Sequence, residues 1–115
     1  MPYLILVVDD EPDIRDVLGE VFVEEGYRVH RAADGQEALT LAAQEPPDVV
    51  VSDIRMPRVD GLELVRRLRA RGQDVPVVLV SAHYVGVDVP GVRFIAKPFD
   101  LDRILAAVES SLAGG

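Results

Sequence analysis

The sequence predicts one domain of alternating β-strands and α-helices, an α/β fold with a doubly wound parallel sheet. The first indication is a series of short, continuous apolar runs rich in β-branched residues, typical of strands covered on both faces. The second is the helical spacing of apolar residues between these runs. With 115 residues, 49% of them hydrophobic, the chain has the size of a single core. We therefore expect residues 1–115 to form one domain, with no output domain.

Five segments have the composition of strands. Three are continuous apolar runs, a fourth run is apolar apart from Arg93, and the more mixed Tyr27–Ala32 is typical of an edge strand. The four runs are Leu4–Val8, Val49–Val51, Val77–Val80 and Val92–Ile95. Each crossover connection between parallel strands is expected to be right-handed.

The first and last helices are predicted from a single apolar face each. The face of the first helix consists of Ile14, Val17, Leu18, Val21 and Phe22. The face of the last helix consists of Leu101, Ile104, Leu105, Val108 and Leu112. Both patterns place one side of the helix against the sheet.

Capping signals mark the two helices between them. Asp34 and Asp60 are each followed three residues later by a glutamate, the spacing of a capping box. In contrast, Ala82–Gly91 contains glycine and proline and has no stable helical period, so we interpret it as a loop or one short turn.

Charge and cysteine content exclude several functions. Twenty acidic against twelve basic residues give a net charge of −8, the wrong sign for neutralising a phosphate backbone. The absence of cysteine excludes disulfides, cysteine zinc sites and a thiol nucleophile. The first apolar run lacks the basic residues of a secretory signal, and no run is long enough to span a membrane. We expect a cytoplasmic protein with no membrane or nucleic-acid partner.

Chemically distinctive side chains follow the predicted strands. Asp9 and Asp10 follow the first strand, Asp53 ends the third, Ser81 ends the fourth and Lys97 follows the fifth. In an open parallel sheet these ends line one crevice. Three carboxylates there either have raised pKa values or share a cation, and oxygen ligands without His or Cys suit Mg²⁺. Any one aspartate alone is explained as a cap or a strand end, but a shared site accounts for the whole set.

Lys97 is the single lysine among twelve cations, the other eleven being arginine. A lysine side chain enters a narrow anionic pocket that a planar guanidinium would overfill. Chance alone would also leave one lysine somewhere in the chain. The position of Lys97 at a strand end, before Pro98, favours a role, and the Lys97–Pro98 bond is a candidate for the cis isomer.

The distinctive residues belong to four segments: Leu6–Glu11, Ser52–Gly61, Ser81-Ala82 and Ala96–Phe99. Together these segments resemble the receiver domain of bacterial two-component response regulators, the CheY-like family. Each is a weak signal alone, but all four occur in order at predicted strand ends. The resemblance implies a flavodoxin-like, five-stranded sheet in the order 2-1-3-4-5.

The resemblance also implies a chemistry. A sensor histidine kinase or a phosphotransfer protein would pass a phosphoryl group from a phosphohistidine to Asp53 with the help of Mg²⁺. Asp10 would bind the metal directly, Asp9 mainly through a metal-bound water, and Asp53 and the carbonyl of Arg55 would complete the protein ligands. Lys97 would pair with the phosphoryl oxygens.

Further residues are assigned by the same resemblance. Ser81 would donate its hydroxyl to the phosphoryl group, and Ala82 is counted among the cofactor-binding residues. Phe94 would swing inward as Ser81 moves and so switch the binding of a downstream protein or output domain, although a plain core or edge aromatic is an equal interpretation. Pro57, Gly61 and Pro98 are interpreted as structural turn residues.

One departure from the family concerns the fourth helix. The interval from Ser81 to Lys97 is about two helical turns shorter than the family's, which indicates a shortened or missing fourth helix. A partner protein or a homodimer would then cover the apolar residues Tyr84, Val85, Val87 and Val89.

Three functions remain at this point. The leading hypothesis is an interaction domain controlled by phosphorylation, which transfers phosphate only to itself and turns over no outside substrate. One alternative is a receiver-like module that binds partners without phosphate. The other, a Mg²⁺-dependent phosphohydrolase, lacks an evident general acid/base beside Asp53.

Overall fold

The computed structural model describes residues 2–82, 89–98 and 100–114. Their five strands form one parallel sheet in the order β2-β1-β3-β4-β5, which confirms the predicted doubly wound α/β fold and its strand order. The strands are β1 (Leu4–Val8), β2 (Arg28–Ala32), β3 (Val49–Asp53), β4 (Val77–Ser81) and β5 (Val92–Ala96).

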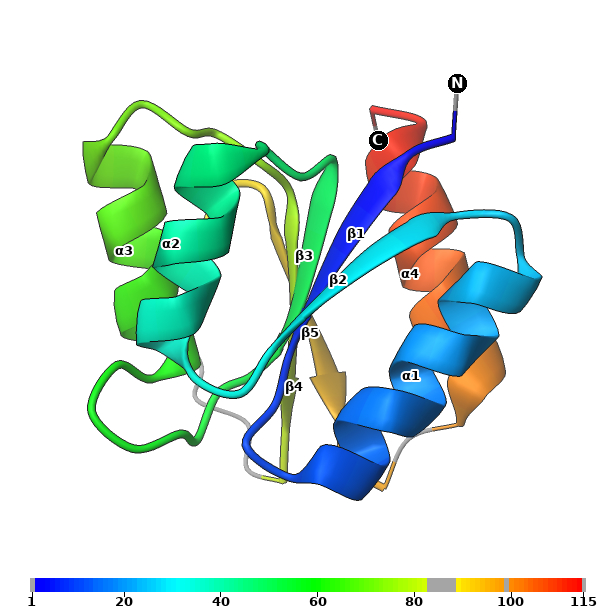
Figure 1. Ribbon diagram of the computed structural model, residues 1–115. Helices are drawn as coiled ribbons and strands as arrows, with labels where there is room; N and C mark the ends of the chain where they lie inside the picture. The colour runs from blue at the N-terminus through cyan, green and yellow to red at the C-terminus, as the bar shows by residue number, and fades with distance from the viewer. Residues whose placement is uncertain (1, 83–88, 99, 115) are drawn as a thin grey trace.

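Helices cover both faces of the sheet (Figure 1). On one face lie α1 (Pro12–Glu24) and α4 (Leu101–Leu112), and on the other lie α2 (Gly35–Gln44) and α3 (Gly61–Ala70). None of the helices in the described parts of the chain has the length and apolar character that a membrane crossing requires.

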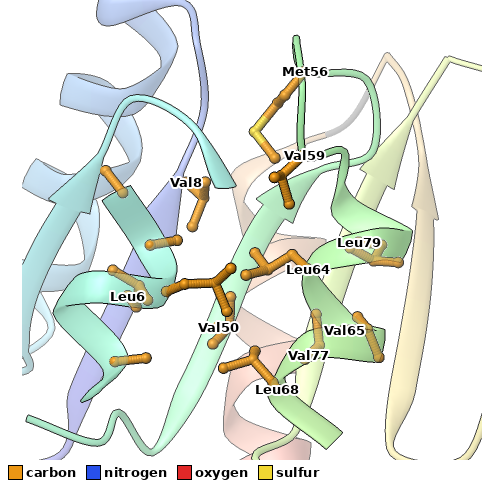
Figure 2. Close-up of a cluster of buried hydrophobic side chains, with 14 of the residues drawn as sticks. Leu6, Val8, Val50, Met56, Val59, Leu64, Val65, Leu68, Val77 and Leu79 are labelled. Atoms are coloured by element: carbon orange, nitrogen blue, oxygen red, sulfur yellow. The ribbon is translucent and has the colours of Figure 1, made fainter. Parts of the chain in front are cut away.

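Alternate residues of each strand enter two separate cores. In β1, Leu6 and Val8 belong to the core under α2 and α3, whereas Ile5 and Val7 belong to the core under α1 and α4. Figure 2 shows the first core, in which Leu64 of α3 points toward the sheet. Because both faces are buried, every position of such a strand is apolar, and this explains the continuous runs in the sequence.

Aspartates cap three of the helices. The Oδ1 atoms of Asp34, Asp60 and Asp100 each accept a hydrogen bond of 2.8 Å from the backbone amide three residues later. The first two caps were predicted from the sequence. The Asp100 cap of α4 was not, because no glutamate follows it at capping-box spacing.

Two expectations near α1 were wrong. Val17 was placed on the apolar face but is 48% exposed, because the buried stripe of the helix is centred on Leu18 and Phe22 and Val17 lies beyond its edge. The second strand begins at Arg28 rather than at Tyr27. The Tyr27 ring instead packs edge-on against Phe22, with ring centroids 6.3 Å apart.

The connection from β4 to β5 is short. The described residues between these strands, Ala82 and Val89–Gly91, contain no helix, and the helix labelled α4 follows β5. This agrees with the predicted shortening or loss of the family's fourth helix. Val89 packs against the core under α2 and α3. The predictions for Tyr84, Val85 and Val87 lie outside the described residues.

Candidate functional site

The carboxyl ends of the parallel strands lie together at one rim of the sheet, at the bottom of Figure 1. In the register of the sheet, Val8 at the end of β1 pairs with Ser52 of β3, and Asp53 pairs with Val80 of β4. Asp9, the residue after Val8, therefore lies beside the end of β3. Residues far apart in the sequence meet here because parallel strands all end at the same edge.

Asp9, Asp10 and Asp53 form an acidic cluster in which one carboxylate oxygen of each lies within 4.8 Å of the others. Asp9 is 3% and Asp53 8% exposed, whereas Asp10 is exposed to solvent. Burial raises the pKa of Asp9 above its usual value; the hydrogen bond from the Glu11 amide, 2.9 Å long, opposes this rise and repulsion from Asp53 adds to it. Keeping the Asp9 carboxylate charged at this position therefore costs free energy.

Lys97 supplies a cation to this cluster. Its Nζ atom lies 3.1 Å from Oδ2 of Asp53, and the other oxygen of Asp53 accepts a hydrogen bond of 3.2 Å from the Arg55 amide. The Lys97 amide donates to the Ser81 carbonyl at 2.7 Å, and the Lys97–Pro98 peptide bond is cis. The backbone of Lys97 is thus held against the end of β4.

Ser81 and Ala82 lie at the same rim. Ser81 is buried at the end of β4, one residue beyond the partner of Asp53, and Ala82 follows it on the surface. Phe94 is half-buried on β5 beside Leu79 and packs against the core under α2 and α3. His83, the next residue in the sequence, lies outside the described residues.

The loop between β3 and α3 borders an open pocket beside Asp10. The pocket has a volume of about 490 Å³ and is lined by Asp10, Ile54, Arg55, Met56, Pro57 and Asp60. Gly61 closes this loop against the strand, since a Cβ atom there would lie 2.6 Å from the Asp53 carbonyl oxygen and 2.9 Å from the Ile54 Cα atom. The sequence analysis interpreted Gly61 as a turn residue but did not predict this close approach to the strand.

Sequence reasoning also missed Arg15. The Nη1 atom of Arg15 in α1 donates a hydrogen bond of 2.9 Å to the carbonyl of Asp9. The only signal in the sequence is that Arg15 stands about a turn and a half of helix after the acidic pair, a spacing that many helical arginines share by chance.

Comparison with known families places this site in context. Residues 5–109 match the family of the response regulator receiver domain. The chain belongs to this family. The receiver domain is 42% identical over 118 residues to "Response regulator MprA" of Mycolicibacterium vanbaalenii and 40% identical to the MprA of Mycobacterium bovis, with 97% of this chain covered in each case. The alignments cover 51% of those relatives, so the chain spans about half their length.

Solved structures agree with this assignment. The receiver domain of the hybrid histidine kinase CckA superposes with a TM-score of 0.82 at 34% identity, covering 95% of this chain and 98% of that one. The Vibrio cholerae chemotaxis protein CheY4 gives a TM-score of 0.85 at 28% identity, covering 97% and 100%. NtrX from Brucella abortus gives 0.88 at 35% identity, covering 99% of this chain and 28% of that chain.

Proposed function

We propose that this receiver domain accepts a phosphoryl group on Asp53 from a phosphohistidine of a sensor histidine kinase or phosphotransfer protein. One observation carries the proposal. Asp53 lies between a cation and two further carboxylates, with Lys97 Nζ 3.1 Å from one of its oxygens and oxygens of Asp9 and Asp10 within 4.8 Å. A nucleophilic carboxylate needs such surroundings because the transferred group brings negative charge of its own.

The acidic cluster has the chemistry of a magnesium site. All its side-chain donors are carboxylate oxygens, the ligands that suit a hard divalent cation, and Lys97 alone leaves three carboxylates undercompensated. Asp10 would hold Mg²⁺ directly and Asp9 mainly through a bound water, with Asp53 and the Arg55 carbonyl as further ligands. When bound, the ion supplies positive charge that offsets the charge on the phosphoryl oxygens.

In the transfer step, an oxygen of Asp53 attacks phosphorus. The bond from phosphorus to the imidazole nitrogen of the donor breaks, and that nitrogen keeps the electron pair. Lys97 then pairs with a phosphoryl oxygen, and Ser81 donates its hydroxyl to another, with Ala82 beside it among the binding residues. The chain positions these groups and neutralises charge, which accounts for most of the catalysis in phosphoryl transfer. No outside substrate is turned over.

The output of the domain is a shift in conformation. Movement of Ser81 toward the phosphoryl group frees space for Phe94, which is half-buried on the neighbouring strand. The added charge favours one arrangement by the difference in free energy between the two. A downstream protein or an output domain binds that arrangement. The greater length of the curated relatives supports an output domain.

Intact-mass spectrometry tests this function. Incubation with Mg²⁺ and a small phosphodonor should add a single, labile phosphate to the wild-type chain and none to Asp53→Asn. Asp74→Asn is the matched control, because Asp74 is exposed and lies before the start of β4, away from the acidic cluster. No adduct from donor or kinase would favour a phosphate-independent interaction module, and many turnovers per chain would favour a phosphohydrolase.

A further inference from the structure

The loop between β1 and α1, Asp9–Glu11, is acidic. Among the described residues, Arg15 is the one arginine whose side chain donates a hydrogen bond to this loop. Its Nη1 atom donates to the carbonyl oxygen of Asp9 at 2.9 Å, in a partly buried hydrogen bond. That oxygen belongs to the peptide that joins Asp9 to Asp10. Although Asp13 and Asp16 stand nearby in α1, the guanidinium of Arg15 forms no ion pair with any carboxylate in the described parts of the chain.

The other described hydrogen bonds of this loop involve the Asp9 amide and the Asp9 carboxylate, whereas the bond from Arg15 goes to the Asp9 carbonyl. The Asp9 amide donates to the Ala32 carbonyl at 3.1 Å, and the Asp9 carboxylate accepts from the Glu11 amide at 2.9 Å. Glu11, the N-cap of α1, makes no side-chain capping bond. The direction in which the exposed Asp10 side chain leaves the loop depends on the plane of the peptide before it, and Arg15 donates a side-chain hydrogen bond to the carbonyl oxygen of that peptide.

Charge and geometry predict opposite effects for this residue. As a cation close to the cluster, Arg15 repels a second cation, so its removal would strengthen metal binding if charge were its whole contribution. As the group that orients the peptide before Asp10, its removal would weaken binding.

We propose that Arg15 is a positioning residue for divalent-cation binding, acting through the Asp9 carbonyl on the direction of Asp10. This rests on the proposed function, in which Asp9 and Asp10 hold Mg²⁺. Partners that orient metal ligands typically contribute 10-fold to 100-fold to metal affinity.

Titration with MgCl₂ at constant ionic strength, followed by the amide NMR shifts of the chain without phosphodonor, tests this inference. Arg15→Met should bind Mg²⁺ about tenfold more weakly than wild type. Arg15→Lys, which keeps the charge and one donor for the carbonyl, should recover part of the affinity. Arg31→Met is the matched control, because Arg31 is an equal charge that packs over Gly19 of α1 and has no described side-chain hydrogen bond to Asp9, Asp10 or Glu11. Its removal should leave affinity within about twofold.

An affinity of Arg15→Met equal to or greater than that of wild type would overturn the positioning role. If Arg15→Met does not fold, Arg15→Gln, which is equally neutral but polar, takes its place with the same expectation. Wild-type shifts that do not respond to Mg²⁺ would overturn the metal site of the proposed function itself, and the two failures are thereby distinguished.

Discussion

Aspartates occur both in the acidic cluster at the rim of the sheet and at the N-termini of the helices, but their electrostatic surroundings are opposite. At the rim, carboxylates crowd within 4.8 Å of one another, and burial raises the pKa of Asp9. At the start of α2, the hydrogen bond from the Glu37 amide lowers the pKa of Asp34, and Arg58, 3.4 Å from the other oxygen, adds to this effect. The capping aspartates therefore stabilise the fold, whereas keeping the buried Asp9 carboxylate charged costs free energy. The difference separates aspartates that stabilise this domain from the aspartates to which the proposed function is assigned.

The largest effect is expected where the two regions meet. Gly61 begins α3 directly after the Asp60 cap and touches the backbone at the end of β3. Gly61→Ala should lower the free energy of unfolding by about 1–3 kcal/mol, because the new methyl group meets main-chain atoms that cannot turn aside. Urea unfolding followed by circular dichroism measures this. An unchanged midpoint would mean that the loop shifts freely and that the rim is not held by α3.

A capping aspartate should be worth somewhat less. Asp34→Ala removes the acceptor for the Glu37 amide and should destabilise the domain by about 1 kcal/mol. Asp74→Ala, an exposed aspartate with no hydrogen bond among those described, is the control and should change stability by less than about 0.5 kcal/mol. Equal changes in the free energy of unfolding for Asp34→Ala and Asp74→Ala would contradict the stabilising role of the cap.

Asp9→Asn should act in the opposite direction. In Mg²⁺-free buffer at neutral pH it should stabilise the domain by up to about 1 kcal/mol, because it removes a buried charge while asparagine keeps an oxygen for the Glu11 amide. Thermal melting of both chains with a chelator present measures the difference. A lower melting temperature for Asp9→Asn would show that the rim carboxylates support the fold.

The pH dependence of stability should separate Asp9 from Asp34 on either side of their ordinary value of 3.8. The folded chain holds the Asp9 proton more tightly than the unfolded chain, so this contribution is present below pH 3.8 and lost as pH rises through the raised pKa. The Asp34 contribution is present above 3.8 and lost as pH falls through the lowered pKa. The contribution of each aspartate is the difference in unfolding free energy between wild type and Asp9→Asn or Asp34→Asn, measured across this pH range. If both contributions changed with pH in the same direction, the opposite pKa shifts of Asp9 and Asp34 would be contradicted.

Local chemistry decided how much the sequence could predict. The runs such as Leu4–Val8 and Val77–Val80 were recognisable because strands covered on both faces are apolar at every position. The strand order and the roles of the rim residues needed the resemblance to receiver domains, since no local pattern encodes which strands are neighbours.

The remaining features depend on three-dimensional contacts. The closeness of Gly61 to the Asp53 carbonyl and the bond from Arg15 to Asp9 arise only when α3 and α1 pack against the sheet. The prediction that Val17 lies on the buried face was wrong because helical spacing gives the centre of an apolar stripe more reliably than its width.

The response of stability to Mg²⁺ tests most directly whether the rim is a cation site. The free energy of unfolding of the wild-type chain should rise with MgCl₂, by about 2.7 kcal/mol when the ion is at one hundred times its dissociation constant. Asp74→Asn, at an exposed aspartate before β4, should respond as wild type does, and Asp10→Asn should lose most of the response. A wild-type chain whose unfolding is indifferent to Mg²⁺, or an Asp10→Asn chain that responds fully, would contradict the account.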